Sequence, residues 1–222
     1  MDGRFVRSLG ALEEREFAIL RGKKVLIAGC GGLGGYLVEY LLRAGVGRIV
    51  AADPKRFERS NLNSQLLCTE ETIGRCKALA AAGRVALVAP DIRFTGHICR
   101  LDSLSLPGLL RGCDAALDAL DNVESRRLLK AECDRQDVPY FFGAVSGWVA
   151  HAALSRKGDA LTEILYPEEY KQKEAGILPF TPALGAAMQA ALCLRFLCGR
   201  PVEAGYLYSF DLLRMDFAQM ML

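Results

Sequence analysis

Residues 24–34 read Lys-Val-Leu-Ile-Ala-Gly-Cys-Gly-Gly-Leu-Gly, and this stretch decides the fold. The apolar run that opens it, Lys24–Gly29, is typical of a strand buried on both faces of a sheet. Gly29–Gly34 then satisfies G-x-G-x-x-G, a pattern in which glycines let the backbone approach a phosphate. The next apolar residues recur at helical spacing as far as Gly45, a suitable C-cap. Strand, glycine loop and helix in this order predict a nucleotide at the helix N-terminus.

The rest of the chain alternates between apolar runs and helical patterns. Strands are predicted at 48–53, 92–99 and 114–120, two more within 140–155, and two short ones within 206–221. Helices are predicted at 69–84 (capped by Thr69), 104–111, 123–136 and 182–197. The charged side chains of 123–136 are expected to form a solvated face: Arg126, Arg127, Lys130, Glu132 and Arg135. This alternation predicts an α/β fold, a Rossmann-like doubly wound sheet, mostly parallel, with antiparallel strands toward the C-terminus.

The 222 residues contain no internal repeat and no Pro/Ser-rich linker, so we expect a single domain over 1–222. Residues 1–22 form an N-terminal helical arm in this interpretation. Residues 157–180 form a charged, loop-like crossover before the last long helix.

Composition excludes several classes of protein. The chain has 28 basic and 26 acidic residues, a net charge of +2, which gives no electrostatic case for nucleic acid or a membrane surface as partner. The charged N-terminus lacks an apolar leader, so a cytoplasmic protein is expected. The 8 cysteines contain no C-x-x-C pair, which disfavours a zinc site or a redox motif and favours buried, reduced thiols.

Polar residues follow the predicted strands where a nucleotide would lie. Asp53 ends the second strand, at the separation where an acid hydrogen-bonds a ribose hydroxyl. Asn, Gln and Lys residues in the blocks 60–65 and 72–77 could hold a triphosphate, and a carboxylate within 117–122 could hold Mg²⁺. The glycine loop and Asp53 alone would also suit an NAD-dependent oxidoreductase, which stays an alternative.

The order of these motifs resembles a known family. GCGGLGG at 29–35, AAD at 51–53, SNLNSQ at 60–65, TIGRCK at 72–77, ALDN at 119–122 and PALGAAMQA at 182–190 follow one another as in ThiF/MoeB/HesA proteins. These proteins are bacterial relatives of ubiquitin-activating enzymes. Arg4–Arg7 is similar to the R-[FY]-x-R opening of the family, and the resemblance covers roughly residues 4–200.

The resemblance implies a function and a set of roles. Family members use Mg-ATP to adenylate the C-terminal glycine of a small ubiquitin-fold carrier such as ThiS or MoaD, in pathways that include thiamine and molybdopterin biosynthesis. These roles transfer by position. The ATP would be cradled by Gly29, Gly31, Gly32 and Gly34, and its ribose would be held by Asp53. The phosphates would be contacted by Asn61, Gln65 and Lys77, and Mg²⁺ would be ligated by Asp121. Lys77, Asp121 and Arg7 would be the catalytic set, with Arg7 inserted into the partner protomer's site, which implies a homodimer.

The sequence departs from the family pattern at three places. Ser64 stands where N-L-N-R-Q has an arginine, and Arg56, Arg59 or Arg75 could compensate. Lys55 replaces the second acid of D-x-D. The crossover has no cysteine, and Gln172 falls near the expected nucleophile, so neither a structural zinc nor a cysteine thioester step is predicted. A turnover-deficient member that only binds nucleotide or a partner is therefore a second interpretation.

Overall fold

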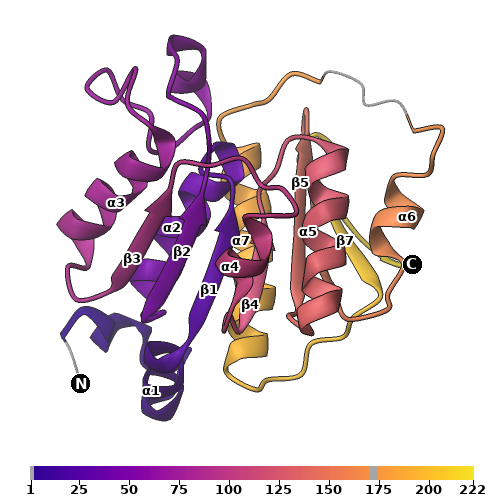
Figure 1. Cartoon of the computed structure of the whole chain (residues 1–222). Coiled ribbons are helices and arrows are strands. Elements are labelled where there is room, and N and C mark those ends of the chain that lie inside the picture. Colours follow the sequence, from indigo (N-terminus) through magenta and orange to yellow (C-terminus); the bar gives the residue numbers. More distant parts are fainter. Residues whose placement is uncertain (1–2, 171–174) are drawn as a thin grey trace.

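In the part of the chain that the computed structural model describes, residues 3–170 and 175–222, the strands form one mixed sheet (Figure 1). Its order is β3-β2-β1-β4-β5-β6-β7-β8. The strands are β1 (Lys24–Ala28), β2 (Arg48–Ala52), β3 (Arg93–His97), β4 (Ala115–Asp118), β5 (Tyr140–Ser146), β6 (Val149–Ser155), β7 (Tyr206–Asp211) and β8 (Asp216–Met221). Strands β1 to β5 pair in parallel and β5 to β8 pair antiparallel, which confirms the predicted fold class.

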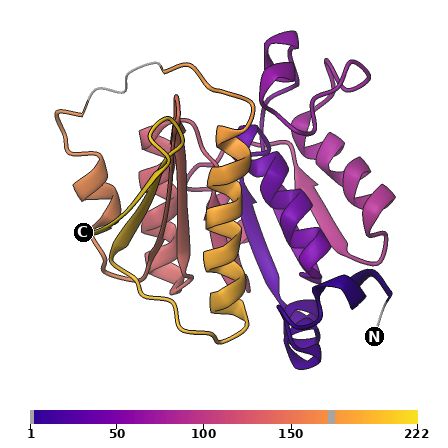
Figure 2. The ribbon, with the colours of Figure 1, turned by 180° about the vertical axis from the view of Figure 1, so that it is seen from behind.

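Helices cover both faces of this sheet. They are η1 (Gly3–Ser8), α1 (Glu14–Gly22), α2 (Gly32–Ala44), η2 (Arg59–Asn63), α3 (Lys77–Val88), α4 (Leu106–Leu110), α5 (Val123–Gln136), α6 (Leu161–Leu165) and α7 (Thr181–Leu197). Helices α2, α3 and α7 enclose one core (Figure 2), and α4, α5 and α6 enclose the other. No helix in the described ranges has the length and apolarity to span a membrane.

The chain order creates a crevice at one end of the sheet. From β1 the chain proceeds to β2 and β3 on one side and then returns to β4 on the other. The loops after β1 and β4 therefore leave the sheet in opposite directions, and ligands of doubly wound sheets bind at this point. Local chemistry sets the nearby helix ends. Gly45 caps α2 with a left-handed φ of 89°, and the Asn122 side chain accepts the Ser125 N–H at the start of α5.

The helix predicted at 69–84 begins later than expected. Helix α3 starts at Lys77, and the preceding residues form turns. The Thr72 hydroxyl donates to the Leu67 carbonyl and accepts the Thr69 N–H, so Thr69 lies in a local turn and caps no helix. Gly74 has a φ of +81°, which interrupts helical geometry.

The predicted solvated face of α5 is wrong for two of its five residues. Arg126 is 6% exposed and Lys130 is 3% exposed. Both lie on the same side of the helix as the buried Leu129 and Cys133, and each has a carboxylate partner: Asp118 for Arg126 and Asp134 for Lys130. Burial of these charges is possible because each one is paired.

In its described residues, 157–170 and 175–180, the predicted crossover contains the short helix α6. Leu161 opens α6 and is 2% exposed in the core that α5 also lines, so this part of the segment is anchored by apolar packing. Gln172, expected near the place of a family nucleophile, lies outside the described residues.

Candidate active site

The glycine loop packs tightly against the end of β4. Gly29 has a φ of +99°, and a Cβ there would lie 2.6 Å from the Ala119 carbonyl oxygen. A Cβ on Gly34 would lie 1.9 Å from the Gly29 carbonyl oxygen. Neither position accepts a side chain, because the atoms in the way are backbone. The loop after β1 and the loop after β4 therefore form one continuous wall of the crevice.

The other two glycines of the loop face the side chains that close the site. A Cβ on Gly31 would meet the Gln65 carboxamide oxygen at 3.6 Å, and one on Gly32 would meet Pro182 at 3.5 Å. The Gln65 oxygen is buried and has no hydrogen-bond partner among the residues that the structure describes. A buried acceptor without a partner is costly, so a ligand that donates a hydrogen bond beside the loop would stabilise it.

Asp53 joins the glycine loop to the segment after β2. Its Oδ2 accepts the Cys30 N–H at 2.8 Å and its Oδ1 accepts the Lys55 N–H at 2.8 Å. The residue is 6% exposed. An ionised carboxylate has about four acceptor sites. Asp53 can therefore fix both loops and still accept a ribose hydroxyl, the role that its position predicts.

Lys77 carries a buried positive charge into the same region. It is the first residue of α3, is 5% exposed, and its Nζ lies 5.5 Å from the centre of the Phe57 ring. Within the described ranges its ammonium has neither a carboxylate partner nor a hydrogen bond. Such a cation, held in place beside a glycine loop, is suited to an anionic ligand.

Two further residues of the 60–65 block, Asn61 and Ser64, use polar atoms in contacts with neighbouring residues. The Asn61 carboxamide oxygen accepts the Glu58 N–H at 3.1 Å and caps η2, and its amide nitrogen donates to the Ser60 hydroxyl at 3.5 Å, so one amide hydrogen remains for a phosphate. The Ser64 hydroxyl donates to Asn63 at 2.9 Å. Two of the arginines expected to compensate for Ser64 have partners of their own: Arg56 donates to the Gly74 carbonyl and Arg59 pairs with Glu70.

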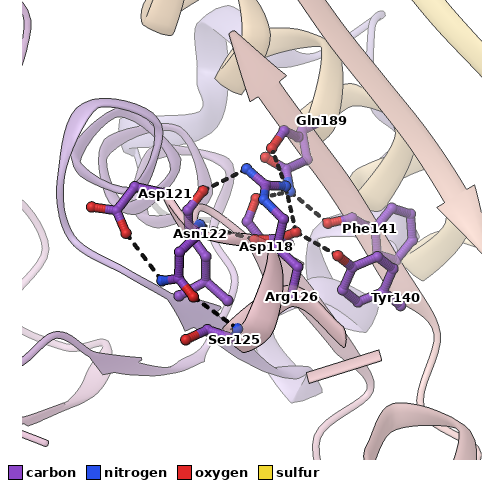
Figure 3. A network of polar contacts seen from close by, with 10 residues as sticks. Asp118, Asp121, Asn122, Ser125, Arg126, Tyr140, Phe141 and Gln189 are labelled. Atoms are coloured by element: carbon purple, nitrogen blue, oxygen red, sulfur yellow. Dashed lines mark hydrogen bonds and ion pairs between the residues drawn. The ribbon is translucent and has the colours of Figure 1, made fainter. Parts of the chain in front are cut away.

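Asp121 lies in the loop after β4, where Lys55 and Asn122 contact it. Lys55 Nζ is 2.5 Å from Asp121 Oδ2, and the Asn122 amide is 3.2 Å from Oδ1 (Figure 3 shows the Asn122 contact). Burial opposes ionisation, but the two donors hold the pKa of the Asp121 carboxyl below its ordinary value. Asn122, and not Asp121, caps α5, so the Asp121 side chain stays on the crevice side of the loop.

The single available carboxylate, Asp121, fits a Mg²⁺ ion whose other ligands come mainly from a bound nucleotide. Mg²⁺ sites of that kind use one or two carboxylates together with substrate phosphates. The Asp121 side chain is 69% exposed and, like Gly32 of the glycine loop, lines the cavity, where it would contribute one carboxylate to such an ion. Asp118, the second nearby carboxylate, is completely buried against Arg126 and Tyr140 and is not available.

A buried polar network that was not predicted from the sequence supports this loop (Figure 3). Arg126 donates to Asp118 Oδ2 at 2.7 Å, to the Gly143 carbonyl at 3.0 Å and to the Leu120 carbonyl. Tyr140 donates to the same carboxylate oxygen, and Gln189 of α7 donates to the Asp118 and Phe141 carbonyls. A signal was present in the sequence, since Arg126 falls three and seven residues before the apolar Leu129 and Cys133. The network fixes the loop that carries Asp121.

A cavity of about 600 Å³ extends from the glycine loop along the sheet. Its walls run from Gly32 and Asp121 past Phe142 to His151 and Tyr166. The Nδ1 of His151 is buried without a partner in the described part of the chain, and burial lowers the pKa of this imidazole. The cavity thus begins beside the glycine loop and is mostly apolar further in.

The N-terminal segment that contains η1, and with it Arg7, lies at the opposite end of the sheet from the start of α2 (Figure 1). The neighbouring Phe5 ring contacts Gly45, at the C-terminal end of α2; a Cβ there would lie 3.0 Å from it. Helix α2 starts at the glycine loop, and its 13 residues span about 20 Å. The structure therefore does not bring Arg7 to the site of its own chain.

Comparisons with known proteins identify relatives of this chain. A sequence model of the ThiF family matches residues 5–222. The sulfur carrier protein adenylyltransferase of Thermus thermophilus is 33% identical over 215 residues, which cover 90% of this chain and 79% of that protein. The sulfur carrier protein ThiS adenylyltransferase of Escherichia coli is 30% identical over 198 residues, covering 86% and 79%.

Solved structures show the same fold. The crystal structure of E. coli MccB with MccA-N7isoASN superposes with a TM-score of 0.87 at 18% identity, covering 99% of this chain and 71% of that one. The structure of MccB with ATP superposes with a TM-score of 0.82, covering 100% and 72% at 18% identity. At this identity the likeness concerns the architecture alone.

Proposed function

The chain belongs to the ThiF family, whose members include adenylyltransferases, and we propose that it adenylates the C-terminal glycine of a small ubiquitin-fold sulfur-carrier protein. ATP is the second substrate in this proposal, and residues 1–222 act as one ATP-binding domain. Relatives named as sulfur carrier protein adenylyltransferases support the choice of substrate.

One observation carries the proposal: the glycine loop and the loop that carries Asp121, which would bind the phosphates and Mg²⁺, also line the cavity. Gly32 belongs to the glycine loop and also lines the cavity, as does Asp121. A nucleotide on the glycine loop would therefore present its α-phosphate to the mouth of this cavity of about 600 Å³, into which the C-terminus of a carrier would extend. Glycines at the end of a carrier suit this passage, because they have no side chain to accommodate.

The reaction then requires no covalent intermediate on the protein. A carboxylate oxygen of the carrier forms a bond to the α-phosphorus, the bond from that phosphorus to the bridging oxygen breaks, and its electron pair leaves with pyrophosphate. Lys77 and the N–H groups at the start of α2 offset the charge on the phosphates, while Asp53 orients the ribose. Asp121 would hold Mg²⁺, which when bound neutralises part of the triphosphate charge.

The cysteines support an enzyme without a thioester step. Cys30, Cys133 and Cys193 are fully buried, and burial raises the pKa of each thiol well above its ordinary range. The two least buried thiols, Cys99 and Cys198, also have raised pKa values, again through burial. Nucleophilic cysteines need the opposite shift.

The position of Arg7 supports a homodimer. This arginine is exposed about one helix length from its own glycine loop. It can assist ATP only in the site of a partner protomer, and a two-fold axis would give both sites an arginine.

Isotope exchange between pyrophosphate and ATP tests the proposal. Exchange should require ATP, Mg²⁺ and a carrier that ends in Gly-Gly, and a carrier with its last glycine removed is the matched control. Absence of ATP binding together with absence of exchange for any Gly-Gly carrier would refute the proposed function.

A turnover-deficient binding protein is the second candidate, because Ser64 hydrogen-bonds to Asn63 and supplies no charge. Ser64→Arg separates the two candidates. If exchange appears only in this variant, the natural chain is a binding member; exchange by the natural chain excludes that interpretation.

A further inference from the structure

An ion pair crosses the mouth of the nucleotide crevice. Lys55 follows the end of β2 by three residues, and Asp121 follows the end of β4 by three. Strand β1, which leads into the glycine loop, lies between these two strands. Adjacent strands are about 4.8 Å apart, so the pair spans roughly 10 Å over the strand that ends in the loop.

The backbone of Lys55 is fixed by the two residues that flank the nucleotide position. Its N–H donates to Asp53 Oδ1 at 2.8 Å, and its carbonyl accepts the Lys77 N–H at 3.0 Å. Only the side chain of Lys55 is free to change position. The side chain can rotate about a backbone that is already fixed beside the expected positions of the ribose and the phosphates.

The ion pair itself can be exchanged at low cost. The side chains of Lys55 and Asp121 are 58% and 69% exposed, and pairs as exposed as this contribute little to stability. An ammonium gains more from a triphosphate, which carries several negative charges, than from one solvated carboxylate. When a nucleotide binds, the Lys55 ammonium is therefore expected to prefer the phosphates to the Asp121 carboxylate.

We propose that Lys55 is a phosphate-binding residue of the nucleotide site, held by Asp121 in the free protein and transferred to the phosphates when ATP binds. This inference rests on the proposed ATP site. Lys55 thus brings a mobile positive charge to a site where Ser64 provides none.

Calorimetric titration with ATP and with adenosine tests the role, in the presence of Mg²⁺ and again with excess EDTA. Lys55→Met should weaken ATP binding by about tenfold in both conditions, the effect of one lost charge contact. Adenosine affinity should stay unchanged because adenosine has no phosphates, and Lys55→Arg should retain most of the ATP affinity.

Lys23→Met is the matched control. Lys23 pairs with Asp114 at 3.1 Å, at the end of the sheet remote from the loop, and its loss should leave ATP binding unchanged. Equal ATP affinity of Lys55→Met and the natural chain would overturn the inference. Tighter ATP binding by Lys55→Met with Mg²⁺ would also overturn it, because Lys55 would then merely obstruct Asp121. If the natural chain binds no ATP, the proposed function fails as well, so the two failures are distinguishable.

Discussion

The ammonium of Lys77 is the buried charge that the fold leaves for a ligand. Lys77→Met keeps the volume of the side chain and removes the charge. Pyrophosphate exchange should fall by about 100-fold or more, the size of effect seen when one charge-stabilising donor is removed from an active site. The melting temperature should stay equal or rise, because a buried cation that has no carboxylate partner among the described residues is replaced by an apolar group.

Lys130→Met should give the reverse pattern and is the control for this prediction. Lys130 is as buried as Lys77 but pairs with Asp134 at 2.6 Å, so its removal should lower the melting temperature and spare exchange. A Lys77→Met variant that retains full exchange would remove Lys77 from the catalytic set.

Lys77, Arg126 and Lys130 differ in how far the position of a charged side chain can be predicted from the sequence alone. Lys77 falls within a motif whose order along the chain indicates its place beside the glycine loop, so it could be expected there from the sequence. For Arg126 and Lys130 the charge predicts a solvated face, and only the spacing of Arg126 to Leu129 and Cys133 indicates the buried side of the helix. The carboxylate partner of Arg126 is Asp118 at the end of strand β4, so this contact exists only after the helix has packed on the sheet. The partner of Lys130 is Asp134 of the same helix.

At the scale of elements, α1 is tied to the segment after α7 by Glu16 and Arg200. Hydrogen bonds from Arg200 and from the Glu13 backbone lower the pKa of Glu16 from 4.5 to about 2. A depressed pKa gives stability that is present above pH 4.5 and is lost as the pH falls through 2. Glu16→Gln should therefore lower the melting temperature at pH 7, and the difference from the natural chain should shrink between pH 4.5 and 2.

Thermal unfolding followed by circular dichroism over that pH range measures the difference. Glu14→Gln is the matched control, because it removes the same charge from the same helical turn without losing the Arg200 contact. A Glu16→Gln difference that stays constant with pH would contradict the assigned ion pair.

Element boundaries could be predicted where local chemistry decides them. Helix α5 has the predicted bounds, and Gly45 ends α2 as expected, because caps depend on residues within one turn. The start of α3 was missed for a tertiary reason. The Lys77 N–H bonds to the Lys55 carbonyl and Arg56 bridges Cys76, so a distant segment holds residues before Lys77 out of the helix.

At the scale of the whole molecule, the N-terminal arm, which precedes β1, and the glycine loop, which follows β1, lie at opposite ends of the sheet. The sequence alone predicts a doubly wound sheet but not this separation, which depends on where η1 packs against α2. The separation means that one protomer contains an incomplete catalytic set if Arg7 takes part in the reaction. Two protomers related by a two-fold axis would complete it twice.

Subunit complementation tests this arrangement. Arg7→Ala and Lys77→Met should each be inactive as homodimers. In a mixed dimer, one site combines the Lys77 of the first variant with the Arg7 of the second and is intact, while the other site lacks both. Random mixing should therefore restore about a quarter of the natural exchange activity, since half of the dimers are mixed and each has one working site. Mixed dimers that form, as shown by differential tags, yet recover no activity would exclude a role for Arg7 in the partner's site.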